Sequence, residues 1–185
     1  MPMPMNRPVS IVPVKNTAQA ADWVKQIAEI ERLVQPQDAW DEQSVTKLLH
    51  QDINHGWVVI TEAKLEDNGF SKQTSPQATP QTVTVAYCLV STVFETAEIL
   101  RIGTHPDFQR RGYAQSLIEQ LIAQMPDKGL DSILLEVRAD NEGAIRLYQK
   151  MGFEVIHTRK GYYTSSKPSG ETERCDALIM QYTRA

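Results

Sequence analysis

Apolar and β-branched residues recur in short runs along the chain, and glycine, proline or polar residues bound each run. Runs of this length and composition are typical of strands that lie half or fully buried in a sheet. Pro13 lies in the first run and favours an edge strand, because proline cannot donate to a central hydrogen-bond ladder. The pattern predicts strands over residues 9–14, 57–60, 82–94, 97–104, 133–137, 153–163 and 177–182.

Four other segments repeat their apolar residues at helical spacing. The first begins near residue 17 and ends before Pro36, and its apolar stripe includes one carboxylate, Glu31. The second begins where either Asp41 or Ser44 can cap it. The third opens directly after the turn at residues 109–114, and the fourth covers residues 141–151.

The order of these elements indicates the fold class. Strands follow one another between residues 57 and 104, which favours an antiparallel meander, and the second half alternates as β-α-β-α-β. Residues 65–81 are rich in Asp, Asn, Gly, Ser, Gln, Thr and Pro, so they predict a long hairpin loop, and residues 164–174 predict a second polar loop. We therefore expect an α/β protein with a mixed sheet in three α/β/α layers, forming a single domain over residues 1–185 with a flexible start at residues 1–8.

Composition and charge narrow the class of protein. The 185 residues are 41% apolar, which suits one ordinary core. The formal net charge of -4 argues against nucleic-acid binding driven by bulk charge. The chain contains no apolar run of the roughly 18 residues that a membrane span needs, and its first residues lack an apolar signal segment, so we expect a cytoplasmic protein without membrane contact. Cys88, Cys175 and the four histidines lack metal-ligand spacing, so we predict reduced thiols and no metal site.

Residues 99–125 carry the first chemical signal. A short apolar strand ends in a basic turn with a glycine, and the turn opens straight into a helix whose first backbone N–H groups have no helical partner. Gly112 permits close approach of a ligand, the amides of residues 110–115 supply donors, and Arg110 and Arg111 supply charge. The turn lacks a Gly-Lys-Ser/Thr sequence and a dinucleotide fingerprint. It predicts a phosphate-bearing cofactor other than ATP or NAD.

Three motifs resemble known acetyltransferases. The turn has the form Q-x-x-G-x-A, which resembles the acyl-CoA pyrophosphate loop of the GNAT superfamily. Residues 135–153 read L-E-V-R-x-x-N-x-x-A-I-x-L-Y-x-x-x-G-F, and residues 159–163 are followed by D-A-x-x-M at residues 176–180. These two motifs are similar to the RimI-type ribosomal-protein N-terminal alanine acetyltransferases. The resemblance covers about half of the chain, roughly residues 95–182.

The resemblance implies a GNAT fold, acetyl-CoA as cosubstrate and a set of site residues. It assigns Glu136 as the general base and Tyr148 as the general acid. Without the resemblance, Glu136 is more often a solvated carboxylate and Tyr148 more often a core residue, so both readings stay open on the residues alone. The implied cofactor contacts are Ile102, Gly103, Thr104, Arg110, Arg111, Gly112, Tyr113, Ala114, Gln115 and Asn141.

The acceptor can be argued from the chemistry of amines. An α-amino group with a pKa of about 7.7 to 8.0 is roughly a quarter neutral near pH 7.4, whereas lysine at about 10.4 is neutral about once in a thousand. One carboxylate base therefore suffices more easily for a protein N-terminus. The resemblance implies the N-terminal alanine of a small-subunit ribosomal protein as the partner, gripped by Tyr162 and Tyr163, with Trp40 as a further substrate contact.

Two departures from the family and two alternatives remain. Asp38-Ala39-Trp40 stands where the family usually has Phe-Pro-Trp, and Tyr113-Ala114 stands where it often has Leu-Gly.

The chain could instead acetylate lysine side chains or a small-molecule amine such as a polyamine or aminoglycoside. It could also be a non-catalytic acyl-CoA-binding regulatory module. We expect no metal in any of these cases, and a monomer or weak dimer.

Overall fold

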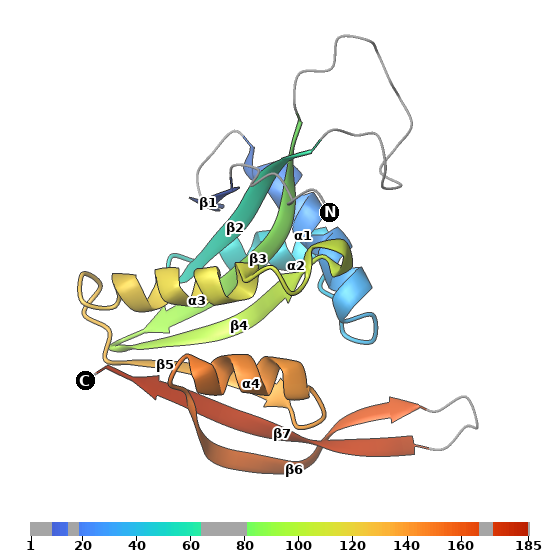
Figure 1. Cartoon of the computed structure of the whole chain (residues 1–185), viewed down its shortest axis with the longest axis vertical. Coiled ribbons are helices and arrows are strands. Elements are labelled where there is room, and N and C mark those ends of the chain that lie inside the picture. Colours follow the sequence, from blue (N-terminus) through green and yellow to red (C-terminus); the bar gives the residue numbers. More distant parts are fainter. Residues whose placement is uncertain (1–8, 15–18, 64–80, 167–171, 185) are drawn as a thin grey trace, which may run out of the picture.

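The structure is a computed structural model of the chain, and it describes residues 9–14, 19–63, 81–166 and 172–184. Within these ranges seven strands form a mixed sheet in the order β1-β2-β3-β4-β5-β7-β6 (Figure 1). The strands are β1 (Val9–Pro13), β2 (Asn54–Ala63), β3 (Gln81–Val93), β4 (Thr96–Thr104), β5 (Ser132–Arg138), β6 (Glu154–Ser166) and β7 (Thr172–Thr183). The helices are α1 (Ala20–Val34), α2 (Glu42–Leu49), the 3₁₀ turn η1 (Pro106–Phe108), α3 (Tyr113–Gln124) and α4 (Glu142–Lys150).

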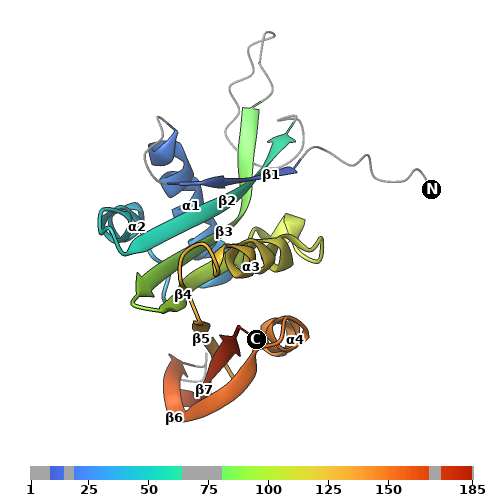
Figure 2. The same cartoon turned by 90° about the vertical axis from the view of Figure 1, so that its left-hand side faces the viewer.

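The helices cover both faces of the sheet, which confirms the predicted three layers. Figure 2 shows α1 and α2 on one side of the strands and α3 and α4 on the other. Strand residues alternate between the two cores, because successive side chains of a strand point to opposite faces. Val58 and Tyr87 pack with α1 and α2, whereas Trp57, Val59 and Cys88 pack with α3.

The sheet opens between β4 and β5, its parallel pair. These strands pair from Thr96↔Ser132 to Ile99↔Leu135, although β4 continues to Thr104 and β5 to Arg138. On the other side of β4, Leu89 pairs with Arg101 and Val90 pairs with Ile99, so Leu100 is an extra residue in β4. A β-bulge of this kind bends its strand and increases the local twist. The bulge coincides with the point at which β4 and β5 separate, and several predicted site residues lie just beyond it.

The predicted polar loop over residues 164–174 is too long, and its middle, residues 167–171, lies outside the described residues. Both strands extend into it, and the pairs are Thr164↔Arg174, Ser165↔Glu173 and Ser166↔Thr172. Polar residues read as a loop, but backbone pairing between two strands does not require apolar side chains, and threonine favours strands. Tyr162 and Tyr163 lie within β6, in agreement with the strand predicted over residues 153–163. The predicted hairpin loop at 65–81 lies almost wholly outside the described residues, as does the start at 1–8.

Side-chain caps fix the first turns of two helices, α2 and α4, that lead into or follow parts of the site. Asp41 caps α2, and its Oδ1 accepts the backbone N–H of Ser44 at 2.8 Å, which decides between the two predicted caps. Asn141 caps α4 in the same way, because its Oδ1 accepts the backbone N–H of Ala144 at 3.2 Å. The second cap fixes the turn that joins β5 to α4.

Candidate active site

A row of free backbone N–H groups opens α3. Arg110 and Gly112 both have a positive φ, of 62° and 85°. The first hydrogen bond into the helix runs from Ser116 N–H to Gly112 O at 2.9 Å, and within the described ranges the amides of residues 110–115 have no backbone acceptor. A Cβ atom at Gly112 would meet nothing within 4 Å, so the space beside the turn is open. Donors at the positive end of a helix, next to open space, suit an anionic group.

Side chains secure this turn and add charge to it. Gln109 donates from Nε2 to the carbonyl of Thr104 at 3.2 Å and so joins the turn to the end of β4. Arg111 donates to the carbonyl of Asp107 at 2.9 Å, and its guanidinium lies 5.0 Å from the centre of the Phe108 ring. The predicted phosphate contacts are thus brought together around one turn.

The predicted thioester strand is packed tightly at Gly103. Gly103 pairs with Tyr87 in β3, and a Cβ atom there would lie 2.7 Å from Cε1 and 2.8 Å from the hydroxyl of Tyr87. A side chain at this position would therefore collide with a fully buried ring. Ile102 and Thr104 flank Gly103, and all three lie beyond the last residue of β4 that pairs with β5.

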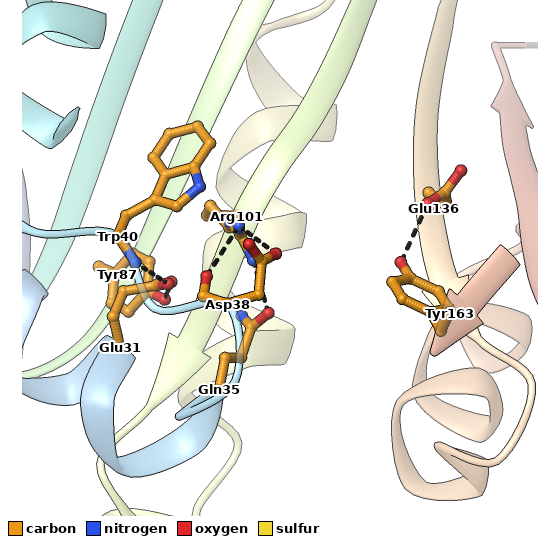
Figure 3. A network of polar contacts seen from close by, with 8 residues as sticks. All are labelled: Glu31, Gln35, Asp38, Trp40, Tyr87, Arg101, Glu136 and Tyr163. Carbon is orange, nitrogen blue, oxygen red and sulfur yellow. Dashed lines mark hydrogen bonds and ion pairs between the residues drawn. The ribbon is translucent and has the colours of Figure 1, made fainter. Parts of the chain in front are cut away.

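Glu136 lies one residue beyond the last β4–β5 pair. Its Oε1 accepts the hydroxyl hydrogen of Tyr163 at 3.0 Å (Figure 3), and its Oε2 forms an ion pair with Nη1 of Arg159 at 2.8 Å. The Glu136 side chain keeps 23% of its surface exposed. Burial, and then the hydrogen bond to Glu136, raise the pKa of the Tyr163 phenol above its ordinary value. Tyr163 is therefore a neutral donor to the carboxylate near neutral pH.

A bulge in β6 brings Arg159 and Tyr163 to this carboxylate. Arg159 pairs with Ala177 and Tyr163 pairs with Cys175, so residues 160–162 all stand opposite Asp176 in β7. Asp176 secures the bulge, because its Oδ1 accepts the backbone N–H of Gly161 at 2.8 Å and its Oδ2 accepts from Nζ of Lys160 at 2.7 Å. Gly161 has a φ of 58°, which glycine adopts without strain.

Ring contacts complete the cluster around Glu136. The Arg159 guanidinium lies 3.5 Å from the centre of the Tyr162 ring, and Tyr162 meets Tyr163 edge to face at 5.1 Å. Tyr163 also lies near Arg138, whose guanidinium is 5.1 Å from the ring centre. Asp140 holds that guanidinium through two contacts of 3.0 and 2.7 Å. Of the predicted substrate residues, Tyr163 contacts the predicted base directly, and Tyr162 lies against its two partners, Arg159 and Tyr163.

Tyr148 lies in the core face of α4. Only 6% of the residue is exposed, and its ring lies 5.9 Å from that of Phe153. Burial raises the pKa of the Tyr148 phenol, so the hydroxyl keeps its proton near neutral pH. No described residue forms a hydrogen bond with this hydroxyl. The residue predicted as the general acid is therefore a buried and protonated phenol.

A second carboxylate network, which the sequence did not predict, lies on the α1 side of β4 (Figure 3). Glu31 is fully buried, its Oε1 accepts from the hydroxyl of Tyr87, and its Oε2 accepts the backbone N–H of Trp40 at 3.0 Å. Burial, and then the charge of Glu31, raise the pKa of Tyr87. A carboxylate on an otherwise apolar helical stripe is the signal that could have revealed this network.

Arg101 fastens the α1–α2 connection to β4. Its guanidinium donates to Gln35 Oε1 at 2.7 Å and to Asp38 Oδ2 at 2.6 Å, and it lies 4.7 Å from the centre of the Trp40 ring. Asp38 is one of the departures from the family pattern, and its contact with Arg101 gives the departure a structural reason. Trp40 and Arg101 thus lie on the β4 side of the site, and Glu136 and Tyr163 lie on the β5 side (Figure 3).

Two further observations concern metals and membranes. In the described ranges, no group of three or more His, Cys, Asp or Glu residues is arranged to hold a metal ion. Cys88 and Cys175 are free thiols, and complete burial raises the pKa of Cys88 to about 12. None of the described helices has the length and apolar character that crossing a membrane requires.

The fold and this arrangement define a class of protein. The acetyltransferase (GNAT) family model matches residues 26–153, and the chain belongs to this family. The crystal structure of the ribosomal-protein-S18-alanine N-acetyltransferase from Escherichia coli is similar over 95% of this chain and 93% of that one, with a TM-score of 0.68 and 23% identity. At that identity, the similarity supports the fold.

Several relatives carry the name of ribosomal protein bS18-alanine N-acetyltransferase, and two of them show the range of similarity. The protein from Haemophilus ducreyi is 31% identical over 139 residues, which cover 75% of this chain and 93% of that protein. The protein from Salmonella typhimurium is 38% identical over 95 residues, 51% of this chain, and this chain spans only 61% of its length. These relatives confirm the resemblance to RimI-type enzymes that the motifs indicate.

Proposed function

We propose that this protein transfers the acetyl group of acetyl-CoA to the α-amine of a protein N-terminus. The observation that carries the proposal is the position of Glu136, a reachable carboxylate one residue beyond the point where β4 and β5 separate. Membership of the GNAT family and the names of the bacterial relatives support the same activity. By those names, the acceptor we propose is the N-terminal alanine of a small-subunit ribosomal protein.

The donor side of the proposal rests on the α3 turn and on β4. We assign the pyrophosphate to the free amides of residues 110–115, with Arg110 and Arg111 adding charge. The open space beside Gly112 supports this assignment, because a bulky anion can approach the backbone there. The backbone of residues 102–104 would hold the pantetheine arm and polarise the thioester carbonyl. Tyr113, Ala114, Gln115 and Asn141 complete the proposed donor contacts.

The chemistry requires a base, an oxyanion donor and a proton for the leaving sulfur. Glu136 would take a proton from the acceptor ammonium, directly or through water, and the freed nitrogen would then attack the thioester carbon. The carbon–sulfur bond breaks as the amide forms, the electron pair leaves on sulfur, and the nitrogen loses its second proton. Tyr148 would share its hydroxyl hydrogen with that sulfur, and the proton that the nitrogen loses would restore the balance, so that the products are the amide, the CoA thiol and a neutral Tyr148. A thiol has a pKa of about 8.5 and a phenol about 10, so Tyr148 shares its proton only as the thiolate forms.

The acceptor side rests on aromatic residues at either side of the separated strands. Tyr162 and Tyr163 lie against Glu136 and Arg159, and we assign them to the backbone of the acceptor peptide. Trp40 is fixed by Arg101 and Glu31 on the β4 side, and we assign it to the acceptor's first side chains. A cytoplasmic location and a monomer or weak dimer stay predictions.

A panel of acceptors tests the activity. The protein should acetylate peptides that begin with alanine in a ribosomal sequence, and should do so more efficiently than the same peptides with a blocked N-terminus and a free lysine. Polyamines and aminoglycosides serve as competing acceptors. Turnover confined to these small amines would overturn the peptide proposal, and CoA binding without any turnover would instead indicate a regulatory module. In cells that lack the protein, the N-terminal acetylation of ribosomal proteins should fall.

A single substitution tests the donor site. Gly112→Asp adds a negative charge and a side chain beside the proposed pyrophosphate, at a backbone position with positive φ. We expect CoA to bind about tenfold or more weakly, because like charges at a helix N-terminus repel. Calorimetry with CoA measures the change, and unaltered affinity would remove the α3 turn from the proposal.

A further inference from the structure

Glu136 holds two partners that differ in how firmly they are fixed. Tyr163, on Oε1, is also held by the edge of Tyr162 and by the Arg138 guanidinium on its ring. Arg159, on Oε2, reaches across from β6, which is separated from the Glu136 strand β5 by β7. Its side chain is 45% exposed. The oxygen that can change partners is therefore Oε2.

Arg159 also has a second contact that does not depend on the carboxylate. Its guanidinium lies 3.5 Å from the centre of the Tyr162 ring, close enough for a cation–π contact. The guanidinium can therefore leave Oε2 and remain attached to the cluster through Tyr162. Asp176 and Gly161 hold the backbone of the adjoining bulge in place, so this exchange needs only side-chain rotation.

An acceptor amine faces a filled carboxylate in this arrangement. Near neutral pH an α-amine is mostly an ammonium. An ammonium and the Arg159 guanidinium both form charge-assisted hydrogen bonds with a carboxylate, so the two cations compete for Oε2. A guanidinium does not release its protons in proteins, so Glu136 gains no proton from Arg159. The acceptor ammonium can bond Oε2 only as Arg159 leaves it.

We infer that Arg159 is a built-in competitor of the acceptor ammonium, which occupies Glu136 in the free protein and is displaced when the acceptor binds. The inference rests on the proposed function. The exchange replaces one cation with another, so Glu136 is never left as an unpaired charge. Arg159 then sets the affinity for the acceptor, and Tyr163 keeps the carboxylate in its orientation throughout.

Substitution of Arg159 should tighten acceptor binding. In Arg159→Gln, the KM for an N-terminal peptide should fall about two- to fivefold, the range expected when a partly exposed ion pair no longer has to be broken. The kcat should stay close to that of the parent. Arg159→Lys keeps a cation on the same strand and should return KM towards the parent value. Guanidinium chloride added to Arg159→Gln should raise KM again without lowering kcat.

Lys160→Gln is the matched control. It removes the same charge from the neighbouring residue, whose side chain is 83% exposed and bonds Asp176 instead of Glu136. We expect the acceptor KM of this variant to remain that of the parent. A fall in KM equal to that of Arg159→Gln would mean that overall charge, and not the contact with Oε2, controls binding.

The opposite result would overturn the inference. A higher KM or a lower kcat in Arg159→Gln would mean that Arg159 positions Glu136 or holds the acceptor itself. Calorimetry of peptide binding in the presence of CoA gives a readout that needs no turnover. Peptide binding without turnover in the parent would refute the proposed function alone, whereas turnover in the parent without tighter binding in Arg159→Gln would refute the inference alone.

Discussion

Two glutamates in this molecule each accept a hydrogen bond from a tyrosine, yet their surroundings suit different roles (Figure 3). Glu31 and Tyr87 are both fully buried, and the other Glu31 oxygen is held by the backbone of Trp40. Glu136 bonds Tyr163 in the same manner, but 23% of its side chain is exposed and its second partner lies at the surface. The exposure of the carboxylate therefore distinguishes the structural pair, Glu31 and Tyr87, from the pair to which we assign the chemistry.

The contrast follows from the elements that carry each pair. Glu31 lies on a helix that packs over the continuous part of the sheet, where β3 and β4 remain paired, so its pair is sealed between layers. Glu136 lies where β4 and β5 have separated, and among the described residues it has no pairing partner on the β4 side. A buried carboxylate must be fully bonded to be tolerated, whereas a partly exposed one can exchange partners. The following predictions test this division.

The largest effect should come from Glu136→Gln. This change keeps the shape and an acceptor for Tyr163 but removes the charge that would take the proton. We expect kcat to fall by about 10²- to 10⁴-fold, the usual range for the loss of a general base. The melting temperature should change little, because an exposed ion pair contributes roughly 0–1 kcal/mol. Steady-state kinetics with an N-terminal peptide measures the first quantity, and unchanged kcat would place the base elsewhere.

Tyr148→Phe should give the next largest loss of activity. The hydroxyl has no hydrogen bond to a described residue, so its removal should leave the stability of the protein nearly unchanged. We expect kcat to fall by about 10²-fold if the hydroxyl serves the leaving sulfur. CoA affinity should remain that of the parent. A variant that acetylates as fast as the parent would leave Tyr148 as a core residue only.

Tyr87→Phe removes a phenol hydroxyl, as Tyr148→Phe does, but should lower stability and leave activity unchanged. It removes the donor to a buried carboxylate, and hydrogen bonds to charged groups contribute about 1.5–3 kcal/mol. The melting temperature should fall by about 3–12 °C for a protein of this size, while kcat stays close to the parent value. Thermal unfolding and kinetics measured on the same preparation test this. A large loss of kcat with unchanged stability would make Tyr87 part of the chemistry.

The candidate site could be predicted where its residues are contiguous in sequence. The α3 turn and the segment from Glu136 to Tyr148 are local motifs, so strand, turn and cap signals place them correctly. Leu100 carries no such signal, because a bulge depends on the register between β3 and β4. Sequence reasoning therefore indicated the sheet and its layers but not the point at which β4 leaves β5.

Contacts between distant elements escaped prediction for a related reason. Arg159 reaches Glu136 across β7, which lies between β5 and β6 in the sheet although it is last in the chain. No spacing in the sequence encodes that order. Arg101 and Asp38 likewise meet only because the α1–α2 connection packs beside β4. The polar composition of residues 164–166 is typical of a loop, and composition alone cannot distinguish a loop from a strand that carries polar side chains.

The smallest effect concerns Asp176, which supports the pair of Glu136 and Tyr163 through the bulge in β6. The hydrogen bond from Lys160, and then the backbone N–H of Gly161, lower the pKa of Asp176 below its ordinary value. A carboxyl whose folded pKa is depressed stabilises the protein above its unfolded pKa of about 3.9, and this contribution is lost as pH falls through the folded value. Asp176→Asn should therefore melt below the parent near neutral pH, and the two melting temperatures should converge in acid. Lys160→Met should reproduce part of this difference, since it removes the first of the two contacts. A gap between parent and Asp176→Asn that stays the same down to the lowest accessible pH would mean that Asp176 supports the bulge through its shape and not through its charge.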